Sequence, residues 1–108
     1  MKLEERKCVP CRAGTPPLGK DESARLLGQL EGWTLDEQGH LTKTYTFPDF
    51  KQALALVDRI GALAEAQNHH PDLALSWGKV RVELWTHKIN GLSENDFIFA
   101  AHCDQLHS

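Results

Sequence analysis

Long hydrophobic runs are missing from this 108-residue chain. Its apolar stretches are far shorter than the roughly 20 residues that a transmembrane helix needs, so we expect no membrane span and no membrane partner. Residues 1–7 carry charged side chains where a secretory signal would carry an apolar core. We therefore expect no secretory signal and, by default, a cytoplasmic location.

Basic residues are also few. Lysine and arginine total 12 against 15 acidic residues, which gives a net charge of −3. Nucleic acid is not an expected partner, because binding phosphates requires clustered lysine and arginine. The chain is 41% hydrophobic and 25% charged, as is usual for a soluble globular protein. Its length suits one domain with a modest core.

Cysteine occurs three times, at Cys8, Cys11 and Cys103. An odd count without a secretory signal argues against a disulfide framework. The Cys8-Val9-Pro10-Cys11 motif could be redox-active, half of a zinc site, or an unpaired thiol pair in a loose arm. We favour the arm, since the glycines and prolines that follow interrupt the strand and helix that a thioredoxin-like motif requires. The chain has no second CxxC to complete a four-cysteine zinc site.

The start of the chain divides into two parts. Residues 1–20 are rich in charge, proline and glycine and predict an irregular arm. A single domain is expected over residues 21–108. Its first helix is predicted over residues 22–30, with Asp21 as N-cap and Gly32 at its end.

A hairpin and a long helix should follow. Alternating apolar and β-branched residues predict strands at 33–36 and 40–47, joined by a glycine turn. Pro48 ends the second strand, and a helix is predicted over residues 49–67. Its expected buried stripe consists of Phe50, Leu54, Val57, Gly61 and Ala64, broadened by Ala53, Ile60 and Leu63.

A second hairpin and a last helix complete the pattern. Strands are predicted at 73–77, where we expect Trp77 in the core, and at 80–85. The last helix should begin at Ser93 with a capping box and run toward Gln105. Short connections between these elements predict an α+β fold of order α-β-β-α-β-β-α: a four-stranded antiparallel sheet with three helices packed on one face. Such a sheet leaves an edge strand, which small domains often protect by pairing across a two-fold axis.

Imidazoles and one carboxylate gather after the long helix. Glu65 and His69 are four residues apart, so a continuous helix would place the carboxylate one turn below the imidazole and orient it. His70 follows directly, and His87 lies beyond the last strand on the polar side. Histidine exchanges protons near neutral pH. The group therefore indicates acid–base chemistry on a small molecule.

Other interpretations of single residues remain open. Histidines near a helix C-terminus also suit its negative end. A three-histidine zinc site is possible in principle, but adjacent residues rarely bind one ion well, and we expect no metal. Asp96 either caps the last helix or also points into a neighbouring pocket. The remaining histidines are expected at the surface: His40, His102 and His107.

One combination of motifs is specific. The chain carries Glu65, then His69-His70-Pro71, then Trp77, Thr86-His87 and the run Gly91-Leu92-Ser93-Glu94-Asn95-Asp96, together with Gly32-Trp33 and Phe47-Pro48-Asp49-Phe50. From about Asp21 onward it resembles pterin-4a-carbinolamine dehydratase. The Cys8-Val9-Pro10-Cys11 arm resembles an extension of bacterial members, and no function is carried onto it.

The resemblance implies a fold, a reaction and an assembly. The fold agrees with the one derived above, and the assembly is a homodimer joined through the sheets or a homotetramer. The reaction is loss of water from 4a-hydroxytetrahydropterin to give quinonoid dihydropterin, with no metal or organic cofactor. It recycles the pterin used by aromatic amino-acid hydroxylases, which would link the protein functionally to such an enzyme.

Roles for the matched residues follow from the same resemblance. His69 and His87 would form the acid–base pair, in an order left open, and His70 would bind substrate or assist. The supporting residues would be Glu65, Asp96 and Trp33. Two alternatives remain. Animal members of the family also act as dimerisation cofactors of a homeodomain transcription factor, and a metal-dependent hydrolase would require bound zinc.

Overall fold

The computed structural model describes Leu3 and residues 16–107. The elements occur in the predicted order: α1 (Lys20–Leu27), β1 (Thr34–Leu35), β2 (Leu41–Thr46), α2 (Phe50–Gln67), β3 (Asp72–Ser76), β4 (Lys79–Leu84), the 3-10 helix η2 (His87–Ile89) and α3 (Glu94–His107). Apart from the short η2, this is the α+β order predicted from the sequence. Cys8 and Cys11 lie outside the described residues, as does most of the predicted arm.

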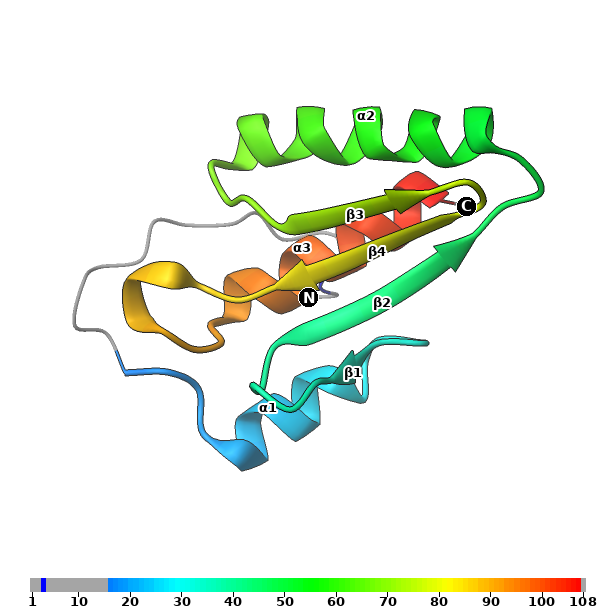
Figure 1. Ribbon diagram of the computed structural model, residues 1–108. Coiled ribbons are helices and arrows are strands. Elements are labelled where there is room, and N and C mark those ends of the chain that lie inside the picture. The colour runs from blue at the N-terminus through cyan, green and yellow to red at the C-terminus, as the bar shows by residue number, and fades with distance from the viewer. Residues whose placement is uncertain (1–2, 4–15, 108) are drawn as a thin grey trace.

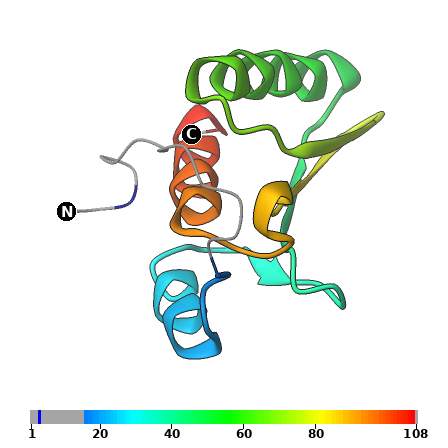
Figure 2. The same ribbon diagram turned by 90° about the vertical axis from the view of Figure 1, so that its left-hand side faces the viewer.

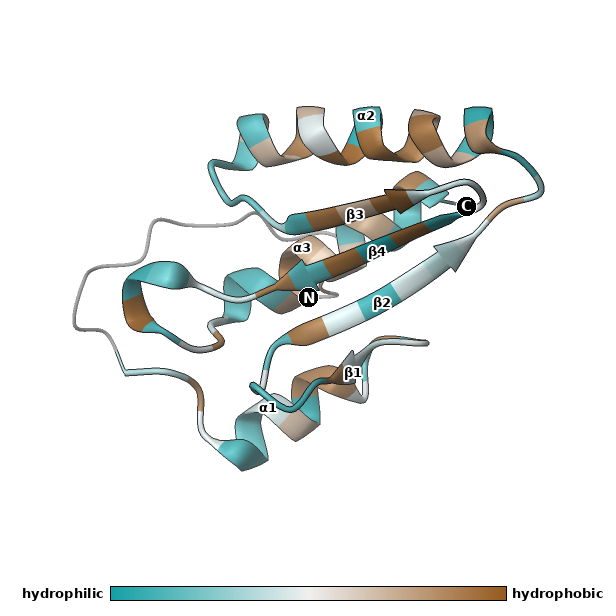
Figure 3. Cartoon of the chain, viewed as in Figure 1, coloured by the Kyte–Doolittle hydropathy of each residue, from teal (hydrophilic) through white to brown (hydrophobic). Residues whose placement is uncertain are grey.

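The four strands form one antiparallel sheet in the order β1-β2-β4-β3. The predicted hairpins β1–β2 and β3–β4 are therefore present, and they join through β2 and β4. The three helices lie on one face of the sheet (Figures 1 and 2). On that face, the side chains of Leu41, Val80 and Val82 are fully buried. The opposite face carries the threonines of β2, and most of that strand is pale in Figure 3 because threonine and tyrosine have intermediate hydropathy.

The buried stripe of α2 differs from the predicted one. The core side chains of the helix are Ala53, Leu56, Ile60 and Ala64, whereas Phe50 and Leu54 are 44% and 41% exposed. Two neighbouring stripes of this helix are apolar at helical spacing, so periodicity alone does not choose between them. The structure buries the stripe with alanine near both ends, which allows close packing on the sheet.

The first helix is shorter than predicted and begins earlier. It starts at Lys20, after Gly19, and Gly28 is its C-cap. Glycine is costly inside a helix, by about 1 kcal/mol relative to alanine. Tighter bonds from Gln29 N to Leu26 O and from Leu30 N to Leu27 O then replace the helical pattern. Gly32, the predicted end, instead occupies a left-handed turn position with φ of 79°.

Trp77 contradicts the prediction that it belongs to the core. Its side chain is 69% exposed, because it lies between Ser76 and Gly78 at the tip of the β3–β4 hairpin. Strand alternation was extended one residue too far, since β3 ends at Ser76. Among the described residues, no helix is long and apolar enough to cross a membrane.

A polar network fastens the end of α3 to the β1–β2 hairpin. Both carboxylate oxygens of Asp104 accept from Trp33 Nε1, at 3.2 and 3.1 Å. Its Oδ1 also accepts from Lys43 Nζ at 2.8 Å and from Tyr45 Oη at 2.5 Å. Burial and the adjacent Asp104 carboxylate raise the pKa of Tyr45 far above its usual value, so this phenol stays protonated and donates.

Asp104→Ala should destabilise the fold by about 1–3 kcal/mol, because the buried Trp33 N–H would lose its acceptor. Asp58→Ala, on the exposed side of α2, is the matched control, and it should change stability by less than about 0.5 kcal/mol. Urea unfolding measures both. Equal stability of the two variants would show that the network contributes little.

Candidate active site

The end of α2 sets the direction of His69. The helix ends at Gln67, and Asn68 follows in the left-handed conformation with φ of 52°. The backbone N of His69 donates to Ala64 O at 3.2 Å, which closes the helix end. Because the left-handed residue turns the chain, His69 leaves the helical register, and its side chain does not lie one turn above Glu65.

The carboxylate partner of His69 is Asp96, from the first turn of α3. His69 Nε2 and Asp96 Oδ1 are 2.7 Å apart. The Asp96 side chain is fully buried, and that of His69 is 11% exposed. Phe99 lies beside the imidazole, with ring centroids 5.8 Å apart. His69 is therefore a mostly buried histidine that is paired with a fully buried carboxylate.

The second oxygen of Asp96, Oδ2, accepts two hydrogen bonds. Oδ2 accepts from Thr86 Oγ1 at 2.9 Å and from the backbone N of Ser93 at 2.9 Å. Ser93 Oγ lies 2.8 Å from Thr86 Oγ1 and is placed to donate to it. The bond from Ser93 N to the Asp96 side chain is half of the predicted capping box. Asp96 therefore caps α3, as one of the two sequence interpretations predicts, and it also binds His69.

The predicted pairing of Glu65 with His69 is wrong. Glu65 Oε2 lies 2.5 Å from Nε2 of His70 instead. This pair is at the surface, with side-chain exposures of 79% for Glu65 and 55% for His70. The turn at Asn68 rotates His70 back toward the last helical turn and sends His69 toward α3.

His87 lies at the same end of the molecule, in the loop after β4. Figures 1 and 2 place the end of α2, η2 and the beginning of α3 together there. The loop is closed by an antiparallel bridge between Thr86 and Gly91. The exposed His87 ring stacks on Trp85, with centroids 4.1 Å apart. Among the described residues it does not contact the His69 ring, and Thr86, bonded to Asp96, is the link between them.

Trp33 lies elsewhere. It is buried against Asp104, near the C-terminal end of α3, two turns of helix beyond Asp96. The structure therefore joins His69 and Asp96, places His70 and His87 on the adjoining segments, and keeps Trp33 in the network described above.

Sequence reasoning missed the surroundings of His40. This residue was expected at the surface without a partner, but its Nδ1 lies 2.7 Å from Glu83 Oε2, and its ring stacks on Trp85 with centroids 4.1 Å apart. Strand alternation does place Glu83 and Trp85 on the polar face. Only the register of β2 against β4 brings His40 to them.

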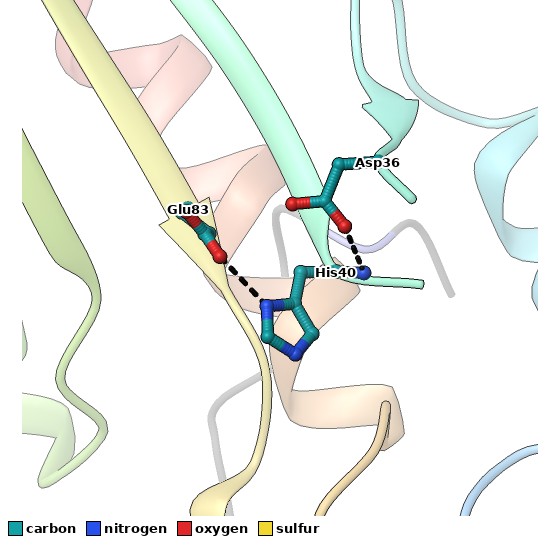
Figure 4. A group of neighbouring side chains, drawn as sticks. All are labelled: Asp36, His40 and Glu83. Atoms are coloured by element: carbon teal, nitrogen blue, oxygen red, sulfur yellow. Dashed lines mark hydrogen bonds and ion pairs between the residues drawn. The ribbon is translucent and has the colours of Figure 1, made fainter. Parts of the chain in front are cut away.

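The same region contains a candidate group for a metal ion. Within the described ranges, Asp36, His40 and Glu83 offer ligand atoms within 4.8 Å of one another (Figure 4). Arg81 already pairs with Glu83 at 2.8 Å and lies 3.9 Å from Asp36, so a guanidinium supplies the positive charge there. His69, His70 and His87 do not form such a group within those ranges.

The His69–Asp96 pair can perform base chemistry. With Asp96 ionised, Nε2 of His69 carries the proton and donates to Oδ1. Nδ1 is then the unprotonated nitrogen and can accept a proton. When it does, the buried carboxylate stabilises the imidazolium. The donors on Oδ2 fix the orientation of the carboxylate and hence the tautomer of the histidine.

Comparison with known sequences gives a consistent result. The family model described as pterin 4 alpha carbinolamine dehydratase matches residues 16–106. A Rickettsia bellii protein provisionally named pterin-4-alpha-carbinolamine dehydratase is 53% identical over 105 residues, covering 96% of this chain and 93% of its own. A Rubrobacter xylanophilus protein with the same provisional name is 49% identical over 104 residues, covering 96% and 97%.

Two solved structures share the fold. A transcriptional coactivator/pterin dehydratase from Brucella melitensis matches with a TM-score of 0.81 and 29% identity, over 85% of this chain and 99% of its own. A pterin dehydratase-like protein identified as a RuBisCO assembly factor in the alpha-carboxysome matches with a TM-score of 0.62 and 25% identity, over 72% and 92%. With the family model covering most of the chain, this protein belongs to the pterin 4 alpha carbinolamine dehydratase family.

Proposed function

We propose that the protein catalyses the dehydration of 4a-hydroxytetrahydropterin to quinonoid dihydropterin. The observation that carries this proposal is the buried hydrogen bond between Asp96 and His69, which leaves one imidazole nitrogen able to accept a proton. Family membership supports the substrate class. No metal or organic cofactor is required, because the step consists of two proton transfers and the loss of water.

The reaction balances with two imidazoles. Nδ1 of His69 accepts the proton from N5 of the pterin as the C4a=N5 double bond forms. The C4a–O bond breaks, and His87 in its protonated form donates to the departing hydroxyl, which leaves as water. Solvent then returns each histidine to its starting state. General acid–base catalysis contributes about 10²–10⁴-fold for each such transfer.

His70 and Glu65 have a supporting role in this mechanism. Their pair lies at the surface beside His69, where it can bind the edge of a substrate or assist proton exchange with solvent. We assign neither the acid nor the base to it, because both side chains are well exposed. Trp33 is omitted from the proposed site, since its N–H is bound to Asp104.

We also propose that the protein assembles with copies of itself. A homodimer or homotetramer is supported by the outer edge of β3, the last strand in the sheet order, and by the exposed Phe50 and Leu54 of α2. Sedimentation analysis measures this assembly. We further propose a cytoplasmic location and a functional link to an aromatic amino-acid hydroxylase.

A spectrophotometric assay of carbinolamine breakdown tests the reaction. Purified protein should accelerate formation of the quinonoid product in proportion to its concentration, and a chelator should leave the rate unchanged. Bovine serum albumin at equal concentration is the control for non-specific buffering. A rate equal to the spontaneous one would overturn the proposed activity, and a rate lost on chelation would favour a metal-dependent enzyme.

A second candidate is a protein-interaction role. One solved relative is described as a transcriptional coactivator/pterin dehydratase, and α2 exposes the apolar side chains of Phe50 and Leu54, which could contact another protein. Affinity capture of a stable protein partner, together with absence of dehydration in the assay above, would favour this alternative. Activity at substoichiometric amounts of protein would favour the enzyme.

A further inference from the structure

The Trp85 side chain makes stacking contacts with two histidine rings. Its ring is stacked with His40 at a centroid distance of 4.1 Å and an interplanar angle of 4°. It is also stacked with His87 at 4.1 Å and 20°. Aromatic rings at such distances attract each other and restrict each other's rotation. The orientation of the His87 imidazole is therefore coupled to the indole.

Of the two histidines that stack on Trp85, His40 is held in place by hydrogen bonds. Its ring Nδ1 is bound to Glu83 Oε2 at 2.7 Å, and its backbone N donates to Asp36 Oδ1 at 2.9 Å, as Figure 4 shows. The side chains of His40 and Glu83 are only 13% and 15% exposed. His40 is thus held from both its backbone and its ring.

Arg81 completes the anchor. Its Nη1 donates to Glu83 Oε1 at 2.8 Å, so each oxygen of this carboxylate has its own partner. Hydrogen bonds from His40 and Arg81 lower the pKa of Glu83, and the carboxylate stays ionised at neutral pH. Glu83 therefore fixes His40 in the orientation that stacks on Trp85.

His87 needs such support. It is exposed and begins a 3-10 helix of three residues whose N-cap, Thr86, makes no side-chain capping bond. An exposed imidazole without a packed neighbour samples several rotamers, whereas a catalytic group must be held close to its reactive position, since a misplacement of about 1 Å can cost about 10²-fold. The stack on Trp85 limits the rotamers that the His87 ring can adopt.

We propose that Trp85, anchored by His40 and Glu83, is a positioning residue that orders the His87 imidazole for proton donation. This inference rests on the proposed function for its catalytic consequence. Trp85 is assigned no contact with substrate, and it acts through His87. The group Asp36–His40–Glu83 then serves as a structural anchor, with Arg81 as its cation, in place of a metal site.

Proton NMR of the histidine rings tests the stack without any substrate. The His87 ring protons should be shifted upfield by the indole ring current. Trp85→Leu should return them toward the values of a free histidine, Trp85→Phe should keep part of the shift, and Glu83→Gln should reduce it by loosening His40. Thr46→Ala, exposed on β2, is the control and should leave it unchanged. An unchanged His87 signal in Trp85→Leu would overturn the proposal.

Kinetics test the catalytic consequence. Trp85→Leu should lower kcat for carbinolamine dehydration by about 10–100-fold with KM within about twofold, and Trp85→Phe should recover activity to within about threefold of wild type. Circular dichroism verifies folding of each variant. An unchanged kcat beside a lost ring-current shift would overturn the positioning role. An inactive wild-type protein would instead overturn the proposed function. The NMR shifts would still show whether His87 stacks on Trp85.

Discussion

His69→Ala should lower kcat for carbinolamine dehydration by about 10²–10⁴-fold, the range for removal of a general base. The imidazole lost is the one whose Nδ1 is left free by the bond between Nε2 and Asp96. No other imidazole within the described residues is bound to a fully buried carboxylate. Steady-state kinetics on the purified variant measure the loss.

His69→Gln separates chemistry from structure. Glutamine can donate an amide N–H to Asp96 in place of Nε2, but it has no group that titrates near neutral pH. It should therefore lose as much activity as His69→Ala while keeping more of the stability. His102→Ala, a half-buried position on α3, is the matched control and should stay within about twofold of wild type. Substantial activity in His69→Gln would rule out His69 as the base.

The fold was largely predictable because its signals are local. Alternation in β2 and β4, Pro48 before the long helix and Ser93 before α3 each determine an element from a few neighbouring residues. Asp49, predicted as the first residue of the long helix, is its N-cap, with Oδ1 accepting from the backbone N of Gln52 at 2.8 Å. What failed was the choice among equally apolar faces, since the exposed positions of Phe50 and Leu54 depend on how α2 sits on the sheet.

The sequence named His69 and Asp96 as candidates but did not predict that they pair. Glu65 and His69 were paired on the assumption of a continuous helix, but the left-handed Asn68 breaks the register. Asn tolerates that conformation better than most residues, so the position of Asn68 after Gln67 was a usable signal. The bond between His69 and Asp96 spans 27 residues, and no local pattern determines which carboxylate the packing of α3 against α2 brings to the imidazole.

The anchor of Trp85 lay beyond sequence reasoning for a similar reason. His40 and Glu83 are 43 residues apart, and they meet because Leu41 pairs with Leu84 in the sheet. Spacing along the chain carries no information about that register. The sequence therefore predicts a surface position for His40, whereas its side chain is only 13% exposed.

Asp96→Asn should lower kcat by about 10²–10⁴-fold while largely preserving the fold, because the substitution changes the tautomer of His69. The carbonyl oxygen of the introduced amide can still accept from Thr86 and Ser93 in place of Oδ2. The NH₂ group of that amide then faces Nε2 of His69 as a donor. The imidazole must accept at Nε2 and carry its proton on Nδ1, which can no longer act as a base.

Nitrogen NMR of the histidine rings distinguishes this cause from a loss of structure. In wild type the proton of neutral His69 should be on Nε2, and in Asp96→Asn it should be on Nδ1. Asp96→Ala should lose activity as well, but it should also lower the free energy of unfolding by about 3–5 kcal/mol, because buried donors lose their charged partner. Glu65→Gln, at the exposed pair with His70, is the matched carboxylate control.

The comparison of Asp96→Asn with Glu65→Gln decides which carboxylate serves catalysis. Both substitutions replace one oxygen by an amide nitrogen beside a histidine, but only Asp96 is buried. A solvated ion pair such as Glu65 with His70 contributes only about 0–1 kcal/mol of interaction free energy. Its loss should therefore change the position of His70 little, and Glu65→Gln should retain kcat to within about threefold. A loss in Glu65→Gln equal to that in Asp96→Asn would move the essential base to His70 and remove His69 from the proposed mechanism.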